Sequence, residues 1–193
     1  MSNINREVNI EDRLDFMPLE GSHFELLKGF SCGVHSIDAY FINIDEAYMD
    51  QELGLSSTTA YFVDGIPAGF VSACCKDIVV SEYEAKDLGV EDDLRVSALE
   101  ITYLCVHQDL QYKEGVSPGF GLGRIIMENI MAEAALMQPI FGFRYIFVWS
   151  RPESIGFYKK FRFILLEQEK QGMRLMRFKM PKTIPSRNKY DDY

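Results

Sequence analysis

The sequence predicts an α/β (α+β) fold, and three observations support this. Segments with helical periodicity alternate with strand-like segments along the 193 residues. A hairpin in the N-terminal half is followed by an apolar strand, a glycine-rich turn and a long helix. The hydrophobic content of 47% is enough for one substantial core, and nothing resembles an interdomain linker. We expect a single domain over residues 1–180 and a flexible tail over residues 181–193.

Two helices are expected before the hairpin. Ser22-His-Phe-Glu25 fits a capping box, so a short helix should start there and end near Gly29. A second helix should end at Gly54, because apolar residues recur in steps of three and four over the preceding segment. These residues are Ile37, Tyr40, Phe41, Ile44, Ala47 and Tyr48.

The hairpin and the central strand come next. Thr59–Val63 and Ile66–Val71 read as two strands around the Asp-Gly turn at 64–65. A short helix fits within the charged segment 80–95. Ser97–Val106 reads as a mostly apolar central strand, and a helix should follow from near Ile125 to about Met137.

The C-terminal third repeats the alternation of strand and helix. Tyr145–Trp149 reads as a buried strand, and Pro152 suits the first turn of another helix. A terminal hairpin is expected from Phe163–Leu166 and Met173–Met180, with Gly172 in its turn.

Charge and cysteine usage exclude several classes of protein. The net charge of −9 argues against a protein wrapped in nucleic-acid phosphate. Residues 144–193 nevertheless carry 12 Lys and Arg against 5 Asp and Glu, so the positive charge gathers at the C-terminal end. Four cysteines without paired spacing and three scattered histidines indicate neither a metal site nor a disulfide framework. With no signal-like or membrane-spanning run, we expect a cytoplasmic protein.

The most informative motif is the glycine-rich turn over residues 118–124, between the central strand and the long helix. Free amides at a helix start can bind phosphate, and glycines leave room for it. A dinucleotide loop lacks its third glycine, because Arg124 stands there, and a triphosphate loop lacks its Lys and hydroxyl residue. The remaining alternative from the residues alone is a turn whose glycines serve packing.

This turn resembles the coenzyme A pyrophosphate loop of the GNAT acetyltransferase superfamily, Arg/Gln-x-x-Gly-x-Gly/Ala. Gly121 and Gly123 match its final pair, whereas Pro118 stands where Arg or Gln is usual; Gln111 is the alternative match, followed by an insertion. The end of the central strand and the segment 154–163, similar to the family's Ala-x-x-Phe-Tyr-x-x-x-Gly-Phe, extend the resemblance to about a third of the chain. Departures are Arg151 for an Asn and Arg162 for a Gly.

A second resemblance lies upstream. Phe30-Ser-Cys-Gly33, Ile37-Asp-Ala-Tyr-Phe41, Thr59, Tyr61 and Gly69 are similar to the N-terminal half of tRNA-acetylating GNAT toxins and their non-toxin relatives. Those toxins use basic surfaces to hold aminoacyl-tRNA, and the acidic net charge of this chain argues against that partner.

The resemblance implies the GNAT fold, with a mixed, mostly antiparallel sheet whose splayed middle strands open a slot for acetyl-CoA. It gives Tyr158 the role of general acid; the alternative from the residues alone is a core aromatic packed on Phe157. Glu100 is the candidate base, or else one half of a structural pair, and His107 acting through water is the third possibility. The candidate cofactor-binding residues are Leu104, Cys105, Val106, Pro118, Gly119, Phe120, Gly121, Leu122, Gly123, Arg124, Arg151 and Ser154.

The predicted function is therefore N-acetyl transfer from acetyl-CoA to a primary amine by direct attack, without a metal. The acceptor is a small molecule or a protein amine, and the protein is expected to be a monomer or a homodimer that binds no membrane. Two alternatives stay open: acetylation of aminoacyl-tRNA, and a GNAT-fold module that binds coenzyme A or a partner without catalysis.

Overall fold

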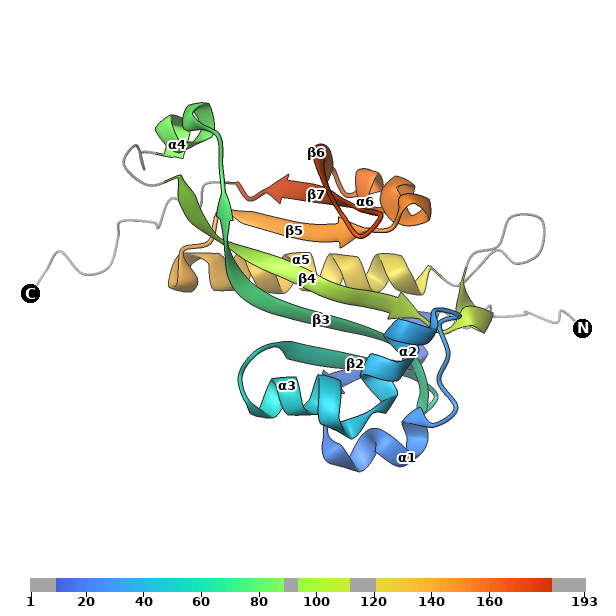
Figure 1. The fold of residues 1–193 in the computed structure, drawn as a ribbon. Coiled ribbons are helices and arrows are strands. Elements are labelled where there is room, and N and C mark those ends of the chain that lie inside the picture. The colour runs from blue at the N-terminus through green and yellow to red at the C-terminus, as the bar shows by residue number, and fades with distance from the viewer. Residues whose placement is uncertain (1–9, 89–93, 112–120, 182–193) are drawn as a thin grey trace, which may run out of the picture. The chain divides into compact units, whose positions relative to one another are not determined.

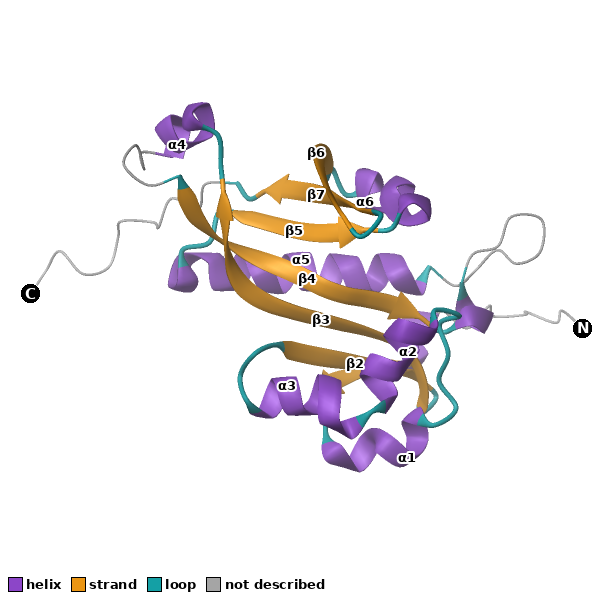
Figure 2. Ribbon diagram, in the orientation of Figure 1, coloured by secondary structure: helices purple, strands orange, loops and turns teal. Residues whose placement is uncertain are grey.

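The computed structural model describes residues 10–88, 94–111 and 121–181, and its strands form a seven-stranded sheet (Figures 1 and 2). The strand order is β1-β2-β3-β4-β5-β7-β6. The strands are β1 (Leu14–Pro18), β2 (Ser57–Val63), β3 (Ile66–Val79), β4 (Arg95–Val106), β5 (Tyr145–Ser150), β6 (Ile164–Lys170) and β7 (Met173–Lys179). Pairing is parallel between β4 and β5 and antiparallel in β1–β2, β2–β3, β5–β7 and β6–β7. The predicted mixed, mostly antiparallel sheet is confirmed.

Helices connect these strands, and two of them, η1 and η4, were not predicted from the sequence. They are η1 (Ile10–Arg13), η2 (Gly21–His23), α1 (Phe24–Leu27), α2 (His35–Ile42), η3 (Ile44–Tyr48), α3 (Met49–Glu52), α4 (Glu82–Leu88), η4 (Gln108–Leu110), α5 (Leu122–Phe141), η5 (Pro152–Ser154) and α6 (Ile155–Lys160). Among the described residues, no helix is long and apolar enough to cross a membrane.

The chain divides into two compact units, which are described separately. The first comprises Met1–Ala73 and Tyr103–Glu128, and the second comprises Cys74–Thr102 and Asn129–Tyr193. The expectation of one domain over residues 1–180 stays a prediction. The expected tail lies outside the described residues, apart from Pro181.

Aromatic rings fill the core of the first unit. Phe41 is fully buried and stacks on Phe70, with ring centroids 4.6 Å apart. Phe30 meets Phe70 edge to face at 4.8 Å, and Tyr40 stacks on Tyr103 of β4 at 4.3 Å. Such pairs add to the stability that comes from burying apolar area. The core therefore joins the segment before α2 to both middle strands of this unit.

The predicted helix through Gly54 is real but interrupted. Asn43 leaves the helical region, with φ −91° and ψ 120°, and its side chain accepts a hydrogen bond from the Asp45 N–H. An asparagine that bonds the backbone in this way caps a new helix. The predicted apolar residues therefore do not all lie on one face across α2 and η3, and Ile44 is exposed.

The predicted capping box needs a correction. The helix begins two residues earlier, because Glu20 and not Ser22 is the residue before η2. The Glu20 N–H donates to Nδ1 of His23 at 3.1 Å, and Ser22 donates to Glu20 instead of receiving first-turn amides. Glu25 pairs with Lys28.

The Asp-Gly turn of the hairpin is confirmed. Asp64 and Gly65 have φ of 52° and 76°, the left-handed values that a two-residue hairpin turn requires. Arg13 forms an ion pair with Asp64, so the residues before β1 are held at this turn. The edge strand β1 itself was not predicted.

Buried polar groups stabilise the second unit. The Arg177 guanidinium lies 4.4 Å from the ring centroid of Tyr145 and forms an ion pair with Glu84 of α4. The pair ties α4 to β7.

Helix α5 runs past the predicted end and includes Pro139. The helix is capped by Gly142, which has a φ of 73° and whose N–H donates to the carbonyl of Gln138.

Candidate functional site

In the first unit, the end of β4 lies against the backbone of β3. A Cβ at Gly69 would lie 2.8 Å from the carbonyl oxygen of Cys105 and 2.8 Å from Cδ1 of Ile126. Real Cβ atoms do not approach so closely, so only glycine fits at this position. The His107 N–H donates to the Ala68 carbonyl at 2.7 Å, which continues the contact past the strand. The predicted cofactor residues Leu104, Cys105 and Val106 therefore lie on a strand end with a fixed position in this unit.

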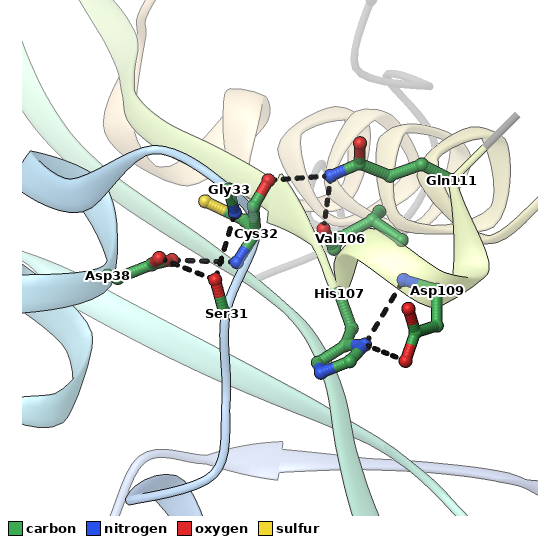
Figure 3. A network of polar contacts seen from close by, with 8 residues as sticks. All are labelled: Ser31, Cys32, Gly33, Asp38, Val106, His107, Asp109 and Gln111. Atoms are coloured by element: carbon green, nitrogen blue, oxygen red, sulfur yellow. Dashed lines mark hydrogen bonds and ion pairs between the residues drawn. The ribbon is translucent and has the colours of Figure 1, made fainter. Parts of the chain in front are cut away.

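A glutamine ties this strand end to the segment before α2 (Figure 3). Nε2 of Gln111 donates to the carbonyl oxygen of Cys32 at 2.9 Å and to that of Val106 at 2.7 Å. The Gln108 N–H donates to the Ser31 carbonyl at 2.9 Å. Both amide hydrogens of Gln111 are used, so this side chain serves as a structural tie and not as a free phosphate ligand. The carbonyl of Val106 is likewise occupied.

Asp38 organises the segment 31–33 from the first turn of α2 (Figure 3). It accepts from the Cys32 N–H at 2.7 Å and from the Ser31 hydroxyl at 2.9 Å. Burial raises the pKa of Asp38, but these hydrogen bonds outweigh it, and the pKa lies below its usual range. The carboxylate is thus a charged anchor for the turn.

His107 caps η4. Its Nδ1 accepts from the Asp109 N–H at 3.3 Å and lies 3.8 Å from the Asp109 carboxylate, and its ring meets Phe30 edge to face. The third candidate base is thus a half-buried histidine with one ring nitrogen used for capping.

The described end of the glycine-rich turn, Gly121, leads directly into α5. Gly121 has a φ of 70°, and a Cβ there would meet nothing within 4 Å. Its carbonyl accepts from the N–H groups of Arg124 and Ile125, so the helix begins directly at Leu122. Arg124 is exposed and lies 3.8 Å from Glu128. Pro118, Gly119 and Phe120 lie outside the described residues.

In the second unit, Glu100 is buried on β4 and is paired. Its carboxylate lies 2.6 Å from Nζ of Lys76, and the Cys74 thiol donates to it at 3.8 Å. The hydrogen bond to Glu100 raises the pKa of Lys76, so the lysine stays charged. This is the structural pairing that the sequence left open as the alternative to a catalytic base.

Tyr158 is buried in the last turn of α6. Its ring packs on Phe157 at 5.1 Å and on Phe163 at 5.7 Å between centroids. Arg162, in the position of the family's glycine, has a φ of 66°. The backbone therefore keeps the left-handed turn that glycine would favour, although the side chain departs from the pattern.

The other two candidate cofactor-binding residues of this unit, Arg151 and Ser154, precede α6. Arg151 is exposed, and its Nη2 lies 2.7 Å from the carboxylate of Glu153. Ser154 is half-buried, and its N–H donates to the Arg151 carbonyl.

Two features of the site had no signal in the sequence. Gln111 and Cys32 are 79 residues apart, so no local spacing reveals their bond. Asp38 reads as one acidic residue on a polar helix face. Within the described ranges, no group of three or more His, Cys, Asp or Glu could hold a metal ion.

Comparison with known proteins finds likeness in structure and not in sequence. No protein-family model matches the chain, and no curated protein matches it. A KacT toxin with one tyrosine changed to phenylalanine has a TM-score of 0.69 and 13% identity, covering 86% of this chain and 95% of that one. The toxin AtaT complexed with acetyl-methionyl-tRNAfMet has a TM-score of 0.68 and 15% identity, covering 86% and 94%.

A third structure is a tyrosine-to-phenylalanine variant of AtaT, bound to acetyl-CoA and to the C-terminus of the antitoxin AtaR. Its TM-score is 0.64 at 14% identity, covering 87% of this chain and 94% of that chain. These toxins have the GNAT fold, and the chain described here shares it. At such low identity the likeness concerns the fold.

Proposed function

We propose that this protein is an N-acetyltransferase that transfers the acetyl group of acetyl-CoA to a primary amine by direct attack. The observation that carries the proposal is the turn at Gly121. It has left-handed φ, open space and a helix of 20 residues behind it, and it lies on a fold shared with a toxin solved with acetyl-CoA.

The cofactor's pyrophosphate would be held by main-chain amides at the start of α5. The first-turn N–H groups of a helix have no helical partners, and the helix dipole favours an anion there. Gly121 leaves these amides uncovered, and Arg124 adds an exposed positive charge. The backbone of Leu104 would pair with the pantetheine arm, as the resemblance implies. The carbonyl of Val106 already accepts a hydrogen bond from Gln111.

Proton transfer would rest on Tyr158. A phenol has an ordinary pKa of about 10 and keeps its proton at neutral pH, so it can protonate the departing thiolate. The resemblance gives this tyrosine that role. Glu100 is a weaker candidate for the base, because its carboxylate is already bound to Nζ of Lys76.

Binding of acetyl-CoA, measured by titration calorimetry, tests the cradle. Gly121→Val should weaken binding strongly, because its side chain would fill the open space and strain the turn. Gly172→Val is the matched control, since Gly172 also has a positive φ, of 76°, and open surroundings but lies in the β6–β7 turn. Equal affinities for the two variants would refute the assignment.

Aminoacyl-tRNA is a second candidate acceptor, and one observation favours it. Lys159, Lys160 and Arg162 are exposed at the end of α6, next in sequence to Tyr158. Exposed cations of this kind bind nucleic-acid phosphate. AtaT was solved with acetyl-methionyl-tRNAfMet. The net charge of −9 opposes such binding, but the positive charge is concentrated in this part of the sequence.

Transfer of a radiolabelled acetyl group distinguishes the acceptors. The panel contains polyamines, lysine peptides and charged tRNAs. If tRNA is the acceptor, Lys160→Glu should weaken its binding, and the affinity of the parent should fall steeply with salt because phosphate contacts release counterions. Transfer to small amines alone would exclude the tRNA acceptor. If the protein binds acetyl-CoA but acetylates no acceptor of the panel, it is a binding module without catalysis.

A further inference from the structure

Two buried thiols meet in the first unit. Cys32 lies in the segment before α2 and Cys105 on β4, and each is 6% exposed. Both are free cysteines, and their side chains are hydrogen-bonded to each other. The proposed acetyl transfer uses neither thiol.

Gln111 ties the backbone at Cys32 to the backbone next to Cys105. One amide nitrogen of Gln111 contacts the carbonyl of Cys32 and that of Val106, the residue after Cys105. Asp38 fixes the Cys32 N–H, and Figure 3 shows this whole set of contacts. A disulfide needs Cα atoms within about 4.4–6.8 Å of each other and side chains that face each other. Cys32 and Cys105 belong to one cluster of buried residues and interact through their side chains, which is the arrangement from which such a bond can form.

The pKa values of the two thiols are shifted in opposite directions. The hydrogen bond with Cys105 lowers the pKa of Cys32, although burial acts in the opposite direction. Burial and the hydrogen bond with Cys32 raise the pKa of Cys105 well above its ordinary range. Because the thiolate is the nucleophile, Cys32 is the thiol that reacts first.

We propose that Cys32 and Cys105 form a redox modification site, in which a small two-electron oxidant such as hydrogen peroxide closes a reversible disulfide. Cys32 loses its proton, and the thiolate attacks peroxide and breaks the O–O bond, so that Cys32 becomes a sulfenic acid. The other oxygen leaves as hydroxide, which takes up the proton that Cys32 released and becomes water. The Cys105 thiol then attacks the Cys32 sulfur, and a second water leaves with its proton. Two thiols lose two electrons and one peroxide becomes two waters.

The burial of the pair makes the site selective for small oxidants. Cys75 is exposed, so bulky thiol reagents should modify it first, whereas Cys32 and Cys105 should resist them until the chain unfolds. The expected pattern is a native chain whose internal pair reacts with peroxide but not with a maleimide.

The test oxidises the Cys74→Ser, Cys75→Ser variant with hydrogen peroxide, so that only the proposed pair can react. Remaining thiols are then alkylated in denaturant, and the digest is analysed by mass spectrometry without reduction. We expect one peptide pair linked through Cys32 and Cys105, lighter than the two free peptides by two hydrogens and separated again by dithiothreitol. If both cysteines are alkylated after an exposure that oxidises Cys75 in the parent chain, the proposal fails.

Single variants test the order of the steps. Cys105→Ala should stop at the sulfenic acid on Cys32, which dimedone traps, whereas Cys32→Ala should leave Cys105 reduced. Trapping on Cys105 and not on Cys32 would overturn the assigned order. The peptide linkage in the Cys74→Ser, Cys75→Ser variant decides the main proposal even if one of these variants fails to fold, and neither measurement depends on acetyltransferase activity.

Discussion

Tyr158 carries two separable properties, a ring that packs in the core and a hydroxyl. Tyr158→Phe keeps the contacts with Phe157 and Phe163 and removes the proposed acid. Turnover should fall by a factor of about 100 or more, as is typical when a positioned proton donor is lost. The free energy of unfolding should fall by no more than about 1 kcal/mol, the usual contribution of one hydrogen bond. Acetyl-CoA affinity should not change.

Steady-state kinetics, calorimetry and urea unfolding measure these three effects. Tyr145→Phe is the control, because Tyr145 is also a buried tyrosine of the second unit and has no proposed role. Undiminished turnover of Tyr158→Phe would leave Tyr158 as a core aromatic.

Arg162 is a second residue at which the departure from the family pattern has a measurable cost. A left-handed backbone costs a residue with a Cβ about 1–2 kcal/mol. Arg162→Gly should therefore raise the free energy of unfolding by roughly 1 kcal/mol. Arg162→Ala keeps the Cβ and removes the same side chain, so it should bring no such gain. Urea midpoints compare the two, and equal midpoints would show that φ at this position stores no strain.

Between elements, Gln111 forms the tie that places the segment before α2 against β4. Gln111→Glu replaces the amide donor by a carboxylate beside two carbonyl oxygens and leaves those carbonyls without their partner. These hydrogen bonds are partly buried, and leaving such carbonyls unsatisfied costs about 1–3 kcal/mol. Gln108→Glu makes the same change on an exposed side chain of η4 and should alter stability little. Similar unfolding curves for the two variants would contradict the structural role of the tie.

The elements that local patterns specify were predictable from the sequence. The hairpin turn at 64–65 has the Asp-Gly pair that positive φ demands, and β4 and β5 are long apolar runs. Strand β1 was missed because four of its five residues are exposed, so no buried alternation marks it. The break at Asn43 was missed because the apolar spacing continues across it.

The candidate residues differ in the same way. The glycine turn and Tyr158 are proposed from motifs that follow the chain. The pairing of Glu100 with Lys76 and the meeting of Cys32 with Cys105 depend on which strands and loops lie side by side, which spacing along one sequence does not encode.

For the whole molecule, pH dependence follows from two carboxylates, one in each unit. Burial raises the pKa of Glu84, but hydrogen bonds from Ser81 and Arg177 outweigh it and leave the pKa below its usual range; Asp38 behaves in the same way. The unfolded chain therefore binds protons more readily than the native one. The stabilisation is complete above the unfolded pKa values of about 3.9 and 4.3 and is lost as pH falls through the lower native ones.

Acid unfolding monitored by circular dichroism should show this loss between about pH 5 and pH 2. Glu84→Gln and Asp38→Asn should each flatten the decline, because the titrating group is gone. Glu167→Gln, on an exposed residue of β6, should leave the slope unchanged. A parent-like slope in Glu84→Gln would mean that its ion pair with Arg177 does not stabilise the native state.

The glycine at position 69 also limits which mutational paths are open to this chain. A Gly69→Ala mutant should lose about 1–3 kcal/mol, as overpacked positions do. Shortening Ile126 would relieve one of the two clashes, but the other is with a main-chain carbonyl, which no substitution elsewhere removes. In a genetic selection for restored protein, we expect reversion at codon 69 itself to predominate over second-site suppressors. A suppressor at codon 126 that restores full stability would show that the strand backbone can move aside.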